Sequence, residues 1–172
     1  MAAYDTVNLV CHVDVSGSCC LNTTSAVGWQ VMAKEKFGCD CGWLQHETNC
    51  FYVPTDKMTW SAGQSFCATR GSQLLTIHDD EENNWICSTV SELSYVSGTL
   101  TWTAGIRDPG GDIVWQDTNG AQSSISYSNW SPGEPIGPAG VADCVGVYVS
   151  FGKWVDIRCS GIHIVVCKKV KS

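Results

Sequence analysis

Residues 39–50 read CDCGWLQHETNC, a polar segment with a cysteine at each end, and Phe51 and Tyr52 follow it directly. Further cysteines stand at positions 67, 144, 159 and 167, and the middle two bracket Trp154. Disulfides across such spacings would close both short and very long loops of the chain. The pattern therefore predicts a compact domain whose two ends are tied together by sulfur.

Length, cysteine content and charge limit what the chain can be. It has 172 residues, 11 cysteines and a formal net charge of -7. This length favours one domain with a small appendage. So many cysteines are typical of an oxidising compartment, so we expect a secreted, extracellular protein. The acidic charge argues against a nucleic-acid partner, because phosphate binding needs clustered basic residues, and Lys168, Lys169 and Lys171 are predicted to form a solvated tail.

Processing and membrane signals are sparse. No apolar stretch follows residues 1–5, so we interpret the chain as a mature or recombinant form with an added Met rather than one with a signal peptide. No apolar run approaches the roughly 20 residues of a transmembrane helix, and no membrane span is expected. Asn22 begins the acceptor sequence Asn-Thr-Thr and is the predicted glycosylation site, whereas the Trp after Asn129 would hinder attachment there.

Four further segments follow residues 39–50 along the chain and belong to the same sequence pattern. They are residues 60–75 (WSAGQSFCATRGSQLL), 102–106 (WTAGI), 129–135 (NWSPGEP) and 165–167 (VVC). With these segments the chain from residue 39 to 172 resembles a C-type lectin-like domain in its long form, in which residues 102–106 replace a Trp-Ile-Gly-Leu motif with one residue inserted. The resemblance implies an α+β fold: two helices, small antiparallel sheets and a long irregular loop region, stapled by disulfides.

The helices of this fold can be placed from the sequence. Residues 61–69 and 80–93 are predicted to be helical, with Asp79 or Asp80 as the cap of the second helix. Acidic residues in the first turn of that helix would lie at the positive end of its dipole.

Strands and loops are predicted for the second half of the domain. Apolar residues alternate from 145 to 151, a turn is expected at Gly152 and Lys153, and residues 162–167 are continuously apolar. The segment from 117 to 144 is rich in Gly, Pro and Ser. Because binding residues often lie on irregular loops held by a rigid scaffold, this segment is the predicted binding loop.

Residues 1–38 lie outside the family pattern and form a separate predicted part, before the lectin-like domain at 39–172. Apolar residues at every second position from 7 to 15 predict a half-buried strand that ends at Gly17 and Ser18. We expect a short, disulfide-tied strand or hairpin that packs on its own chain or on a neighbouring one. Since an exposed strand can add to another sheet, this extension is a candidate assembly arm.

The family resemblance also implies three disulfides, Cys39–Cys50, Cys67–Cys167 and Cys144–Cys159. Five cysteines remain, which are Cys11, Cys19, Cys20, Cys41 and Cys87. Five is odd, so at least one thiol must be free, bonded to another molecule or paired with a second copy. The simplest interpretation joins Cys41 to Cys11, Cys19 or Cys20.

Interchain bonding and zinc binding are two other possible roles for the extra cysteines. The helical pattern predicts Cys87 on the outer side of the second helix, which leaves an interchain disulfide open. Zinc is disfavoured, because the spacing of Cys19-Cys20 and Cys39-x-Cys41 lacks the separation and the matching second pair that zinc sites have.

The family resemblance implies calcium as a possible cofactor. In sugar-binding members of the family, a Ca²⁺ ion in the long loop bonds directly to sugar hydroxyls. Glu134 and Asp156 match two of its ligands, but Ile136, Ala142 and Val155 stand at the other side-chain positions. Calcium needs six to eight oxygen ligands, and apolar side chains have none. The sequence therefore argues against the usual calcium-dependent sugar site, and no cofactor is expected to be required.

The remaining carboxylates leave two interpretations open. Glu134 and Asp156, with Asp143, could hold a metal ion in the loop. The resemblance places Asp108 and Asp112 at the auxiliary calcium site of the family, where they could hold an ion together with Asp143. Alternatively, Asp108, Asp112 and Asp143 are three solvated loop carboxylates.

The positions that lost polar ligands have become apolar. Ile136, Val141 and Val155 are predicted to cluster at the loop surface as a patch that meets protein, or to fold inward as a minor core. The predicted ligand-binding residues of the loop are Glu134, Ile136, Asp143, Tyr148, Val155 and Asp156.

The leading hypothesis is a secreted, non-enzymatic recognition module that binds a glycan or an extracellular protein through residues 117–159. Trp130 and Tyr127 offer faces for a sugar ring, or else pack within the loop. The alternative is a structural protein whose domain self-associates through residues 1–38 and the extra cysteines, as a disulfide-linked or strand-mediated homo-oligomer. Because the sequence has no nucleophile elbow, phosphate loop or acid pair at diagnostic spacing, no enzyme is expected.

Overall fold

The computed structural model describes residues 12–13, 19–20, 38–40, 42–93, 99–137, 140 and 143–171. The chain divides into two compact units, one made of residues 1–50 with 170–172 and the other of residues 51–169. In the first unit, the short strands β1 (His12–Val13) and β2 (Cys19–Cys20) pair antiparallel. Apart from Gly38, the rest of the predicted extension, including Cys11 and Asn22, lies outside the described residues, and so does Cys41.

Both predicted helices are present, and their bounds agree with the sequence to within one residue. Helix α1 (Trp60–Ala68) begins after Thr59, whose hydroxyl accepts the N–H of Ala62 at 3.3 Å. Helix α2 (Asp80–Glu92) begins after Asp79, whose carboxylate accepts the N–H of Glu82 at 2.8 Å. These caps satisfy backbone N–H groups that have no partner within the helix.

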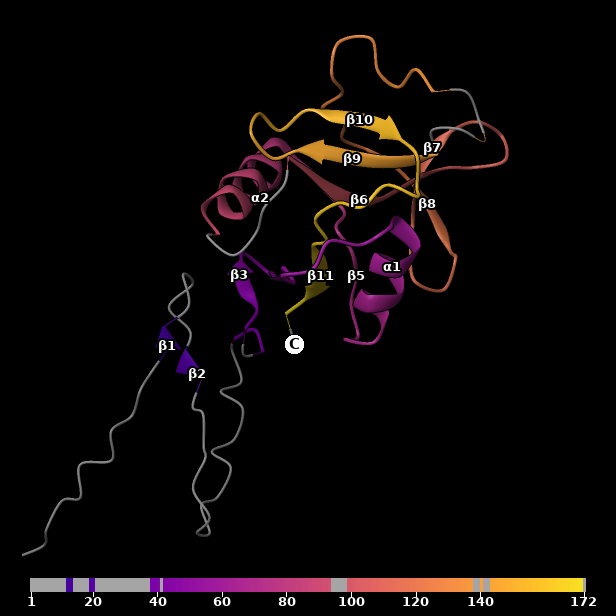
Figure 1. The fold of residues 1–172 in the computed structure, drawn as a ribbon. Coiled ribbons are helices and arrows are strands. Elements are labelled where there is room, and N and C mark those ends of the chain that lie inside the picture. Colours follow the sequence, from indigo (N-terminus) through magenta and orange to yellow (C-terminus); the bar gives the residue numbers. More distant parts are fainter. Residues whose placement is uncertain are drawn as a thin grey trace, which may run out of the picture. The chain divides into compact units, whose positions relative to one another are not determined.

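A five-stranded antiparallel sheet forms the centre of the larger unit (Figure 1), in the order β10-β9-β6-β7-β8. Its strands are β6 (Leu100–Arg107), β7 (Ile113–Gln116), β8 (Gln122–Ser124), β9 (Cys144–Tyr148) and β10 (Trp154–Ile157). The turn between β9 and β10 includes Gly152, whose N–H bonds the carbonyl of Tyr148, so the turn expected there is confirmed.

The inserted residue of the WTAGI segment is accommodated by a bulge in β6. Trp102 pairs with Gly146 and Ile106 with Cys144, so the register shifts between these two pairs. The Thr103 hydroxyl fills the bulge, since it donates to the Val145 carbonyl at 2.9 Å and accepts the Gly105 N–H at 3.1 Å. A bulge absorbs an extra residue without displacing the rest of the strand.

A second sheet has four strands in the order β3-β4-β11-β5. They are β3 (Leu44–His46), β4 (Asn49–Tyr52), β5 (Gln73–Leu74) and β11 (Cys167–Val170). The predicted strand over 162–167 is wrong in its bounds, because β11 begins only at Cys167. Before it, Ile164 bonds across to β6, with its N–H on the Leu100 carbonyl and its carbonyl accepting the Trp102 N–H. From Ile164 to Val166 the apolar run reflects burial rather than strand structure, whereas Ile162 is 56% exposed.

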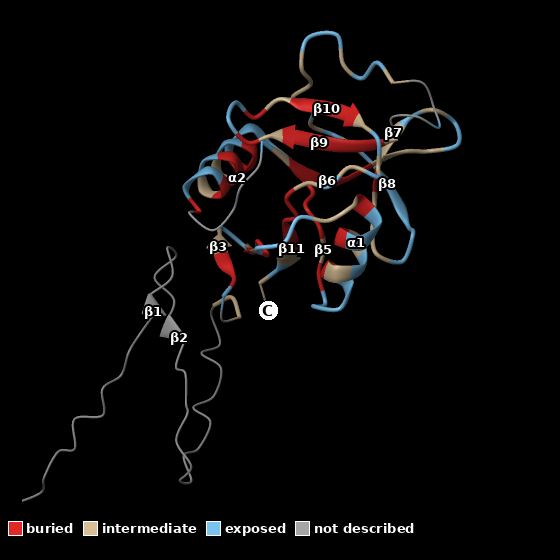
Figure 2. Ribbon diagram, viewed as in Figure 1, coloured by how far each residue is buried: buried red, intermediate tan, exposed pale blue. Residues whose placement is uncertain are grey.

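The core lies between the helices and the five-stranded sheet, in which β6, β9 and β10 are mostly buried whereas β8 is exposed (Figure 2). The predicted alternation along β9 does not appear as a half-exposed strand, because Val145, Gly146 and Val147 are all buried. A Cβ on Gly146 would lie 3.1 Å from Ile157 and 3.3 Å from Leu100, so its missing side chain lets these two residues close over that face. The largest fully buried side chains are Trp102, Trp154, Phe51, Leu74, Leu75, Ile77 and Ile86.

Three disulfides join the described cysteines as Cys39–Cys50, Cys67–Cys167 and Cys144–Cys159, which are the pairs that the resemblance implies. The prediction for Cys87 is wrong. Its side chain is buried, because α2 turns residues 83, 87 and 90 inward, and its thiol lies near the carbonyl of Tyr148. An interchain disulfide at Cys87 is therefore incompatible with this packing.

The predicted solvated lysine tail is also corrected at Lys168. This residue is only 4% exposed, and its ammonium group pairs with the carboxylate of Glu82 and donates to the Thr76 carbonyl at 2.9 Å. Lys168 thus ties β11 to the start of α2 from inside the domain. In the described part of the chain, no helix is long and apolar enough to cross a membrane.

Candidate ligand-binding loop

The segment between β7 and Cys144 is less irregular than its composition predicts. It first forms the short strand β8, which pairs with β7, and becomes irregular after Ser124. The hypothesis of a long irregular loop therefore holds for residues 125–143, of which 138–139 and 141–142 lie outside the described residues.

The first part of the loop is anchored on Trp154 of β10. The backbone of Trp154 donates to the Asn129 carbonyl at 2.9 Å and accepts the Ser131 N–H at 2.8 Å. The rings of Tyr127 and Trp130 lie edge-on to Trp154, each with centroids 5.7 Å away. Both rings therefore pack against Trp154, but both residues are only half-buried, so part of each ring stays accessible and both roles stay open for them.

The side chain of Asn129 is also occupied by internal bonds. Its amide nitrogen donates to the Gly152 carbonyl at 2.9 Å, and its amide oxygen accepts from Lys153 at 2.5 Å. Attachment of a glycan would break the first of these bonds. This arrangement agrees with the expectation that Asn129 is a hindered acceptor.

Asp156, also on β10, holds the next part of the loop. Its side chain is fully buried, and its two oxygens accept backbone N–H groups from Ile136 at 3.1 Å and Gly137 at 2.9 Å. The guanidinium of Arg107 donates to the same carboxylate at 2.6 Å. A buried carboxylate requires such donors, because an unpaired buried charge is very costly.

Glu134, which lies in the loop itself, is the neighbouring carboxylate of Asp156. Its carboxylate accepts the Ile136 N–H at 3.2 Å, and the peptide bond from Glu134 to Pro135 is cis. Burial, the hydrogen bond with Asp156 and the charge of Asp156 raise the pKa of Glu134 above its usual value. The proton is therefore held more readily on Glu134 than on its neighbour.

Asp156 shows the opposite behaviour. Burial alone would raise its pKa, but hydrogen bonds from Glu134, from the N–H groups of Ile136 and Gly137 and from Arg107 outweigh burial and lower it. Asp156 is thus the ionised member of the pair, and Arg107 is the charge that compensates it.

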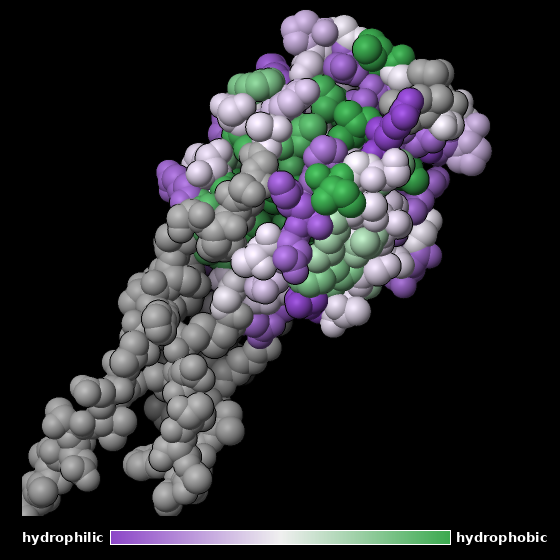
Figure 3. Space-filling model, in the orientation of Figure 1, coloured by the Kyte–Doolittle hydropathy of each residue, from purple (hydrophilic) through white to green (hydrophobic). Residues whose placement is uncertain are grey.

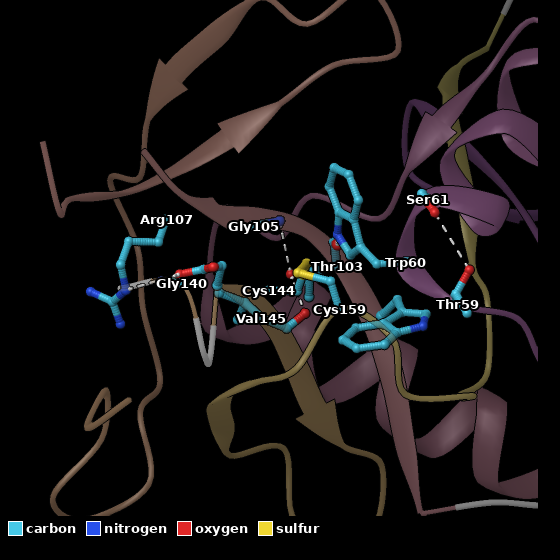
Figure 4. The surroundings of a disulfide bond; sticks show 12 residues. Thr59, Trp60, Ser61, Thr103, Gly105, Arg107, Gly140, Cys144, Val145 and Cys159 are labelled. Carbon is cyan, nitrogen blue, oxygen red and sulfur yellow. Dashed lines mark hydrogen bonds and ion pairs between the residues drawn. A yellow bond between two sulfur atoms is a disulfide. The ribbon is translucent and has the colours of Figure 1, made fainter. Parts of the chain in front are cut away.

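Asp143 lies on the other side of Arg107. Its carboxylate accepts the Gly140 N–H at 2.8 Å and lies 3.9 Å from the Arg107 Nε, while its carbonyl accepts the Arg107 backbone N–H at 2.7 Å. Figure 4 shows Arg107 and Gly140 on one side of the Cys144–Cys159 disulfide and Trp60 on the other. The disulfide thus lies directly after the loop segment that Asp143 closes.

The two predicted auxiliary carboxylates belong to a turn. Asp108 accepts the N–H of Asp112 at 2.9 Å, and the backbone of the two residues bonds at 2.8 Å, which closes the connection from β6 to β7. Arg107 donates to the Gly111 carbonyl at 2.9 Å within the same turn. Asp108 therefore has a structural partner within this turn.

The other predicted site residues are differently exposed. Ile136 is 72% exposed, whereas Val155 is 6% exposed in β10 and so cannot belong to a surface patch with it. Val141 lies outside the described residues. Tyr148 stacks on Phe151 in the β9–β10 turn, with ring centroids 4.8 Å apart. Figure 3 shows separate hydrophobic areas set among hydrophilic ones on one face.

The carboxylates as arranged do not fit a calcium ion. Among the described residues, no three of Glu134, Asp143, Asp156, Asp108 and Asp112 bring one oxygen each within 4.8 Å of one another. Calcium needs six to eight oxygens at about 2.4 Å. Both oxygens of Asp156 already face donors, one of which carries a positive charge.

Arg107 is the functional residue that sequence reasoning missed. It lies at the end of β6, 49 residues before Asp156, and no local pattern connects the two. The clue in the sequence is an arginine that directly follows the buried WTAGI strand and precedes two aspartates.

Comparison with known proteins identifies the family. The model of the C-type lectin domain matches residues 56–169, so the chain belongs to the C-type lectin family. Domains of this family bind glycans or proteins and are generally non-enzymatic recognition modules.

Two relatives illustrate how similar the chain is to known proteins and how much of each it covers. The chain is 31% identical to a perlucin-like protein of Mytilus galloprovincialis over 71% of its own length and 76% of that protein. It is 27% identical to human C-type lectin domain family 10 member A over 76% of its own length, but it spans only 40% of that longer relative.

Solved structures show the same fold. The carbohydrate-recognition domain of the mouse scavenger receptor C-type lectin has a TM-score of 0.65 at 26% identity and matches 78% of this chain and 98% of its own. A calcium-independent type II antifreeze protein has a TM-score of 0.61 at 26% identity, with coverage of 78% and 95%. The predicted lectin-like fold is thus confirmed.

Proposed function

We propose that this chain is a secreted recognition module that binds an extracellular glycan or protein through its long loop, without a calcium ion between protein and ligand. The observation that carries the proposal is the state of Asp156. Its two oxygens accept two backbone N–H groups and a guanidinium N–H and share a further hydrogen bond with Glu134, so the four lone-pair sites of the carboxylate face partners within the protein rather than an ion that would bridge to a ligand.

Secretion is supported by the cysteines. Three disulfides, one of which closes a separation of 100 residues, are bonds that persist in oxidising compartments. The similarity to a calcium-independent antifreeze protein supports the idea that this fold can act without the ion.

The contact with ligand is direct in this proposal. Ile136 stands at a ligand position of the family's calcium site, and its side chain points away from the core with 72% exposure. An apolar side chain at the rim of a loop adds buried area to a protein contact or covers the apolar face of a sugar ring. The neighbouring N–H groups are used internally, which keeps Ile136 in a fixed place.

The test uses the purified chain on arrays of glycans and of extracellular proteins, with calcium and with a chelator. We expect at least one binding signal, of equal strength in both conditions. Ile136→Asp should abolish it, whereas Ile162→Asp, which changes an exposed isoleucine outside the loop, should not. A glycan signal that disappears with chelator would overturn the calcium-independent part, and equal loss in both variants would overturn the role of the loop. Thermal hysteresis without any array signal would replace recognition by ice binding.

A further inference from the structure

A pocket of about 270 Å³ lies between the β7–β8 hairpin and the segment that contains β5. Its lining comes from within residues 73–78 on one side and residues 115–123 on the other, so all of it belongs to the larger unit and precedes the irregular loop 125–143. Pockets for drug-sized ligands measure roughly 300 to 1,000 Å³, so this pocket has room for a small ligand.

Both sides of the pocket are fixed by bonds to other elements. Asp117 closes the turn of the hairpin, since its carboxylate accepts the Ala121 N–H at 2.8 Å. The hairpin lies beside α1 (Figure 1), where Gln64 donates to the Asp117 carbonyl at 2.9 Å. On the opposite side, Lys168 donates to the Thr76 carbonyl at 2.9 Å. The pocket is therefore formed before a ligand arrives, which lowers the cost of binding.

Thr76 gives the pocket a polar group that is not used internally. This residue is only 5% exposed, and within the described ranges its buried hydroxyl has no hydrogen-bond partner. An unpaired buried hydroxyl costs free energy that a partner would recover. Because a hydroxyl both donates and accepts, a hydroxyl group of a ligand in the pocket would be a suitable partner for Thr76.

The rest of the lining suits a neutral ligand that carries several hydroxyls. Gln122 and Ser123 line the pocket from β8 and are exposed, as is His78 on the opposite side. Burial and the charge of Lys168 lower the pKa of His78, so its ring is neutral near pH 7 and has both a donor and an acceptor. Trp115, which is 4% exposed, adds an aromatic part to the lining, against which the apolar face of a sugar ring can pack.

We infer that this pocket is a second binding site, which takes a single neutral sugar unit without calcium and in which the ligand supplies the missing partner of the Thr76 hydroxyl. The site shares no residue with the irregular loop, so it goes beyond the proposed function and does not depend on it. Because few groups contact so small a ligand, we expect dissociation constants in the millimolar range.

Two-dimensional NMR of the amide groups tests this site, with glucose, galactose, mannose or N-acetylglucosamine added at millimolar concentrations in the presence of a chelator. At least one sugar should give saturable shifts at the amides of Ala121, Gln122 and Ser123. Thr76→Val removes the hydroxyl but keeps the shape of the side chain, so it should weaken this binding by about tenfold. Thr69→Val, which changes an exposed threonine after α1, is the matched control and should bind as the wild type.

Stability of the free protein gives an independent readout of the same substitution. Since the Thr76 hydroxyl has no partner to lose within the described ranges, Thr76→Val should unfold at the same denaturant concentration as the wild type or at a higher one. A marked loss of stability, or failure to fold, would mean that the hydroxyl is already paired and would overturn the inference.

Three NMR results would also contradict it. They are the absence of saturable shifts with every sugar, shifts confined to the irregular loop, and binding that Thr76→Val leaves unchanged. Gln122→Ala changes an exposed residue of the pocket and should weaken binding severalfold without affecting the fold, so unchanged binding in this variant would likewise count against the site. Ile136→Asp should leave the pocket shifts as they are, which keeps failure of this site distinguishable from failure of the array experiment.

Discussion

The body of the domain and its long loop are held together by different forces. In the body, buried apolar side chains surround β6 and β9, and Cys67–Cys167 closes most of the chain into one covalent ring. The irregular loop after β8 is instead held by hydrogen bonds to Trp154 and Asp156 and by the charge of Arg107. Because many apolar contacts stabilise the body, losing any one of them should alter its structure little. The conformation of the loop depends instead on a few polar groups.

This difference explains how one fold can serve several ligands. Changes in the loop alter the contact surface without reaching the core, because the loop meets the body at a few residues of β6, β10, the β9–β10 turn and the start of α2. In this chain an isoleucine stands at one ligand position of the family's calcium site, and Asp156, which matches another, is paired with an arginine. The following experiments test whether the two regions are as independent as their contacts indicate.

The largest effect is expected from opening the long covalent ring. Replacing both Cys67 and Cys167 by Ala should lower the free energy of unfolding by about 4 to 5 kcal/mol in the chain-entropy model, because the pair closes a separation of 100 residues. The double Ala variant of Cys39 and Cys50, whose separation is 11, should lose only about 3 kcal/mol. Chemical denaturation measures both. Equal losses would show that ring size does not govern stability here.

A second large effect is expected at the buried ion pair. Lys168→Met leaves the carboxylate of Glu82 buried without its cation and should cost about 3 to 5 kcal/mol. The double variant Lys168→Met, Glu82→Met removes both charges and should recover most of this loss. Denaturation of the two variants side by side is the measurement. A single variant as stable as the wild type would refute the structural role of Lys168.

The same substitution, Ile to Ala, can be made once in the body and once in the loop to compare how much each region contributes to stability. Ile164 lies in the body and is only 1% exposed, so Ile164→Ala leaves a cavity in the core. This substitution should lower the free energy of unfolding by about 2 to 5 kcal/mol. Ile136→Ala changes a loop residue that is 72% exposed and should shift stability by less than about 0.5 kcal/mol. Similar losses in both variants would mean that the loop is part of the core.

The buried thiol of Cys87 is expected to make a smaller contribution to the stability of the protein, and this contribution depends on pH. Burial raises its pKa to about 11, so the folded protein disfavours the thiolate. Stability from this shift is present below the ordinary thiol pKa and is lost as pH rises toward 11. Native protein at pH near 8 should therefore resist alkylation by iodoacetamide, and unfolded protein should react. Rapid labelling of the native protein, absent in Cys87→Ala, would contradict the buried position.

Local patterns in the sequence predict much of the body. Both helices were placed within one residue, because caps such as Asp79 and the apolar spacing are local signals. The WTAGI segment also indicated an extra residue, which the bulge in β6 accommodates.

Long-range polar contacts could not be predicted in the same way. Lys168 looks like part of a basic tail until Glu82, far upstream, is placed beside it. Arg107 and Asp156 are likewise distant in sequence, and arginine has no place in the family's calcium motif. The helical pattern predicts the wrong face for Cys87, because two adjacent residues of α2, Ile86 and Cys87, are both buried. Apolar periodicity identifies a core, but it does not tell which charges meet within it.

The most direct test of the account is a calorimetric titration of the wild-type protein with calcium at millimolar concentration. The account expects no saturable binding, because the guanidinium of Arg107 already compensates Asp156 inside the loop. Saturable binding of one ion per chain that Asp156→Asn abolishes would contradict it.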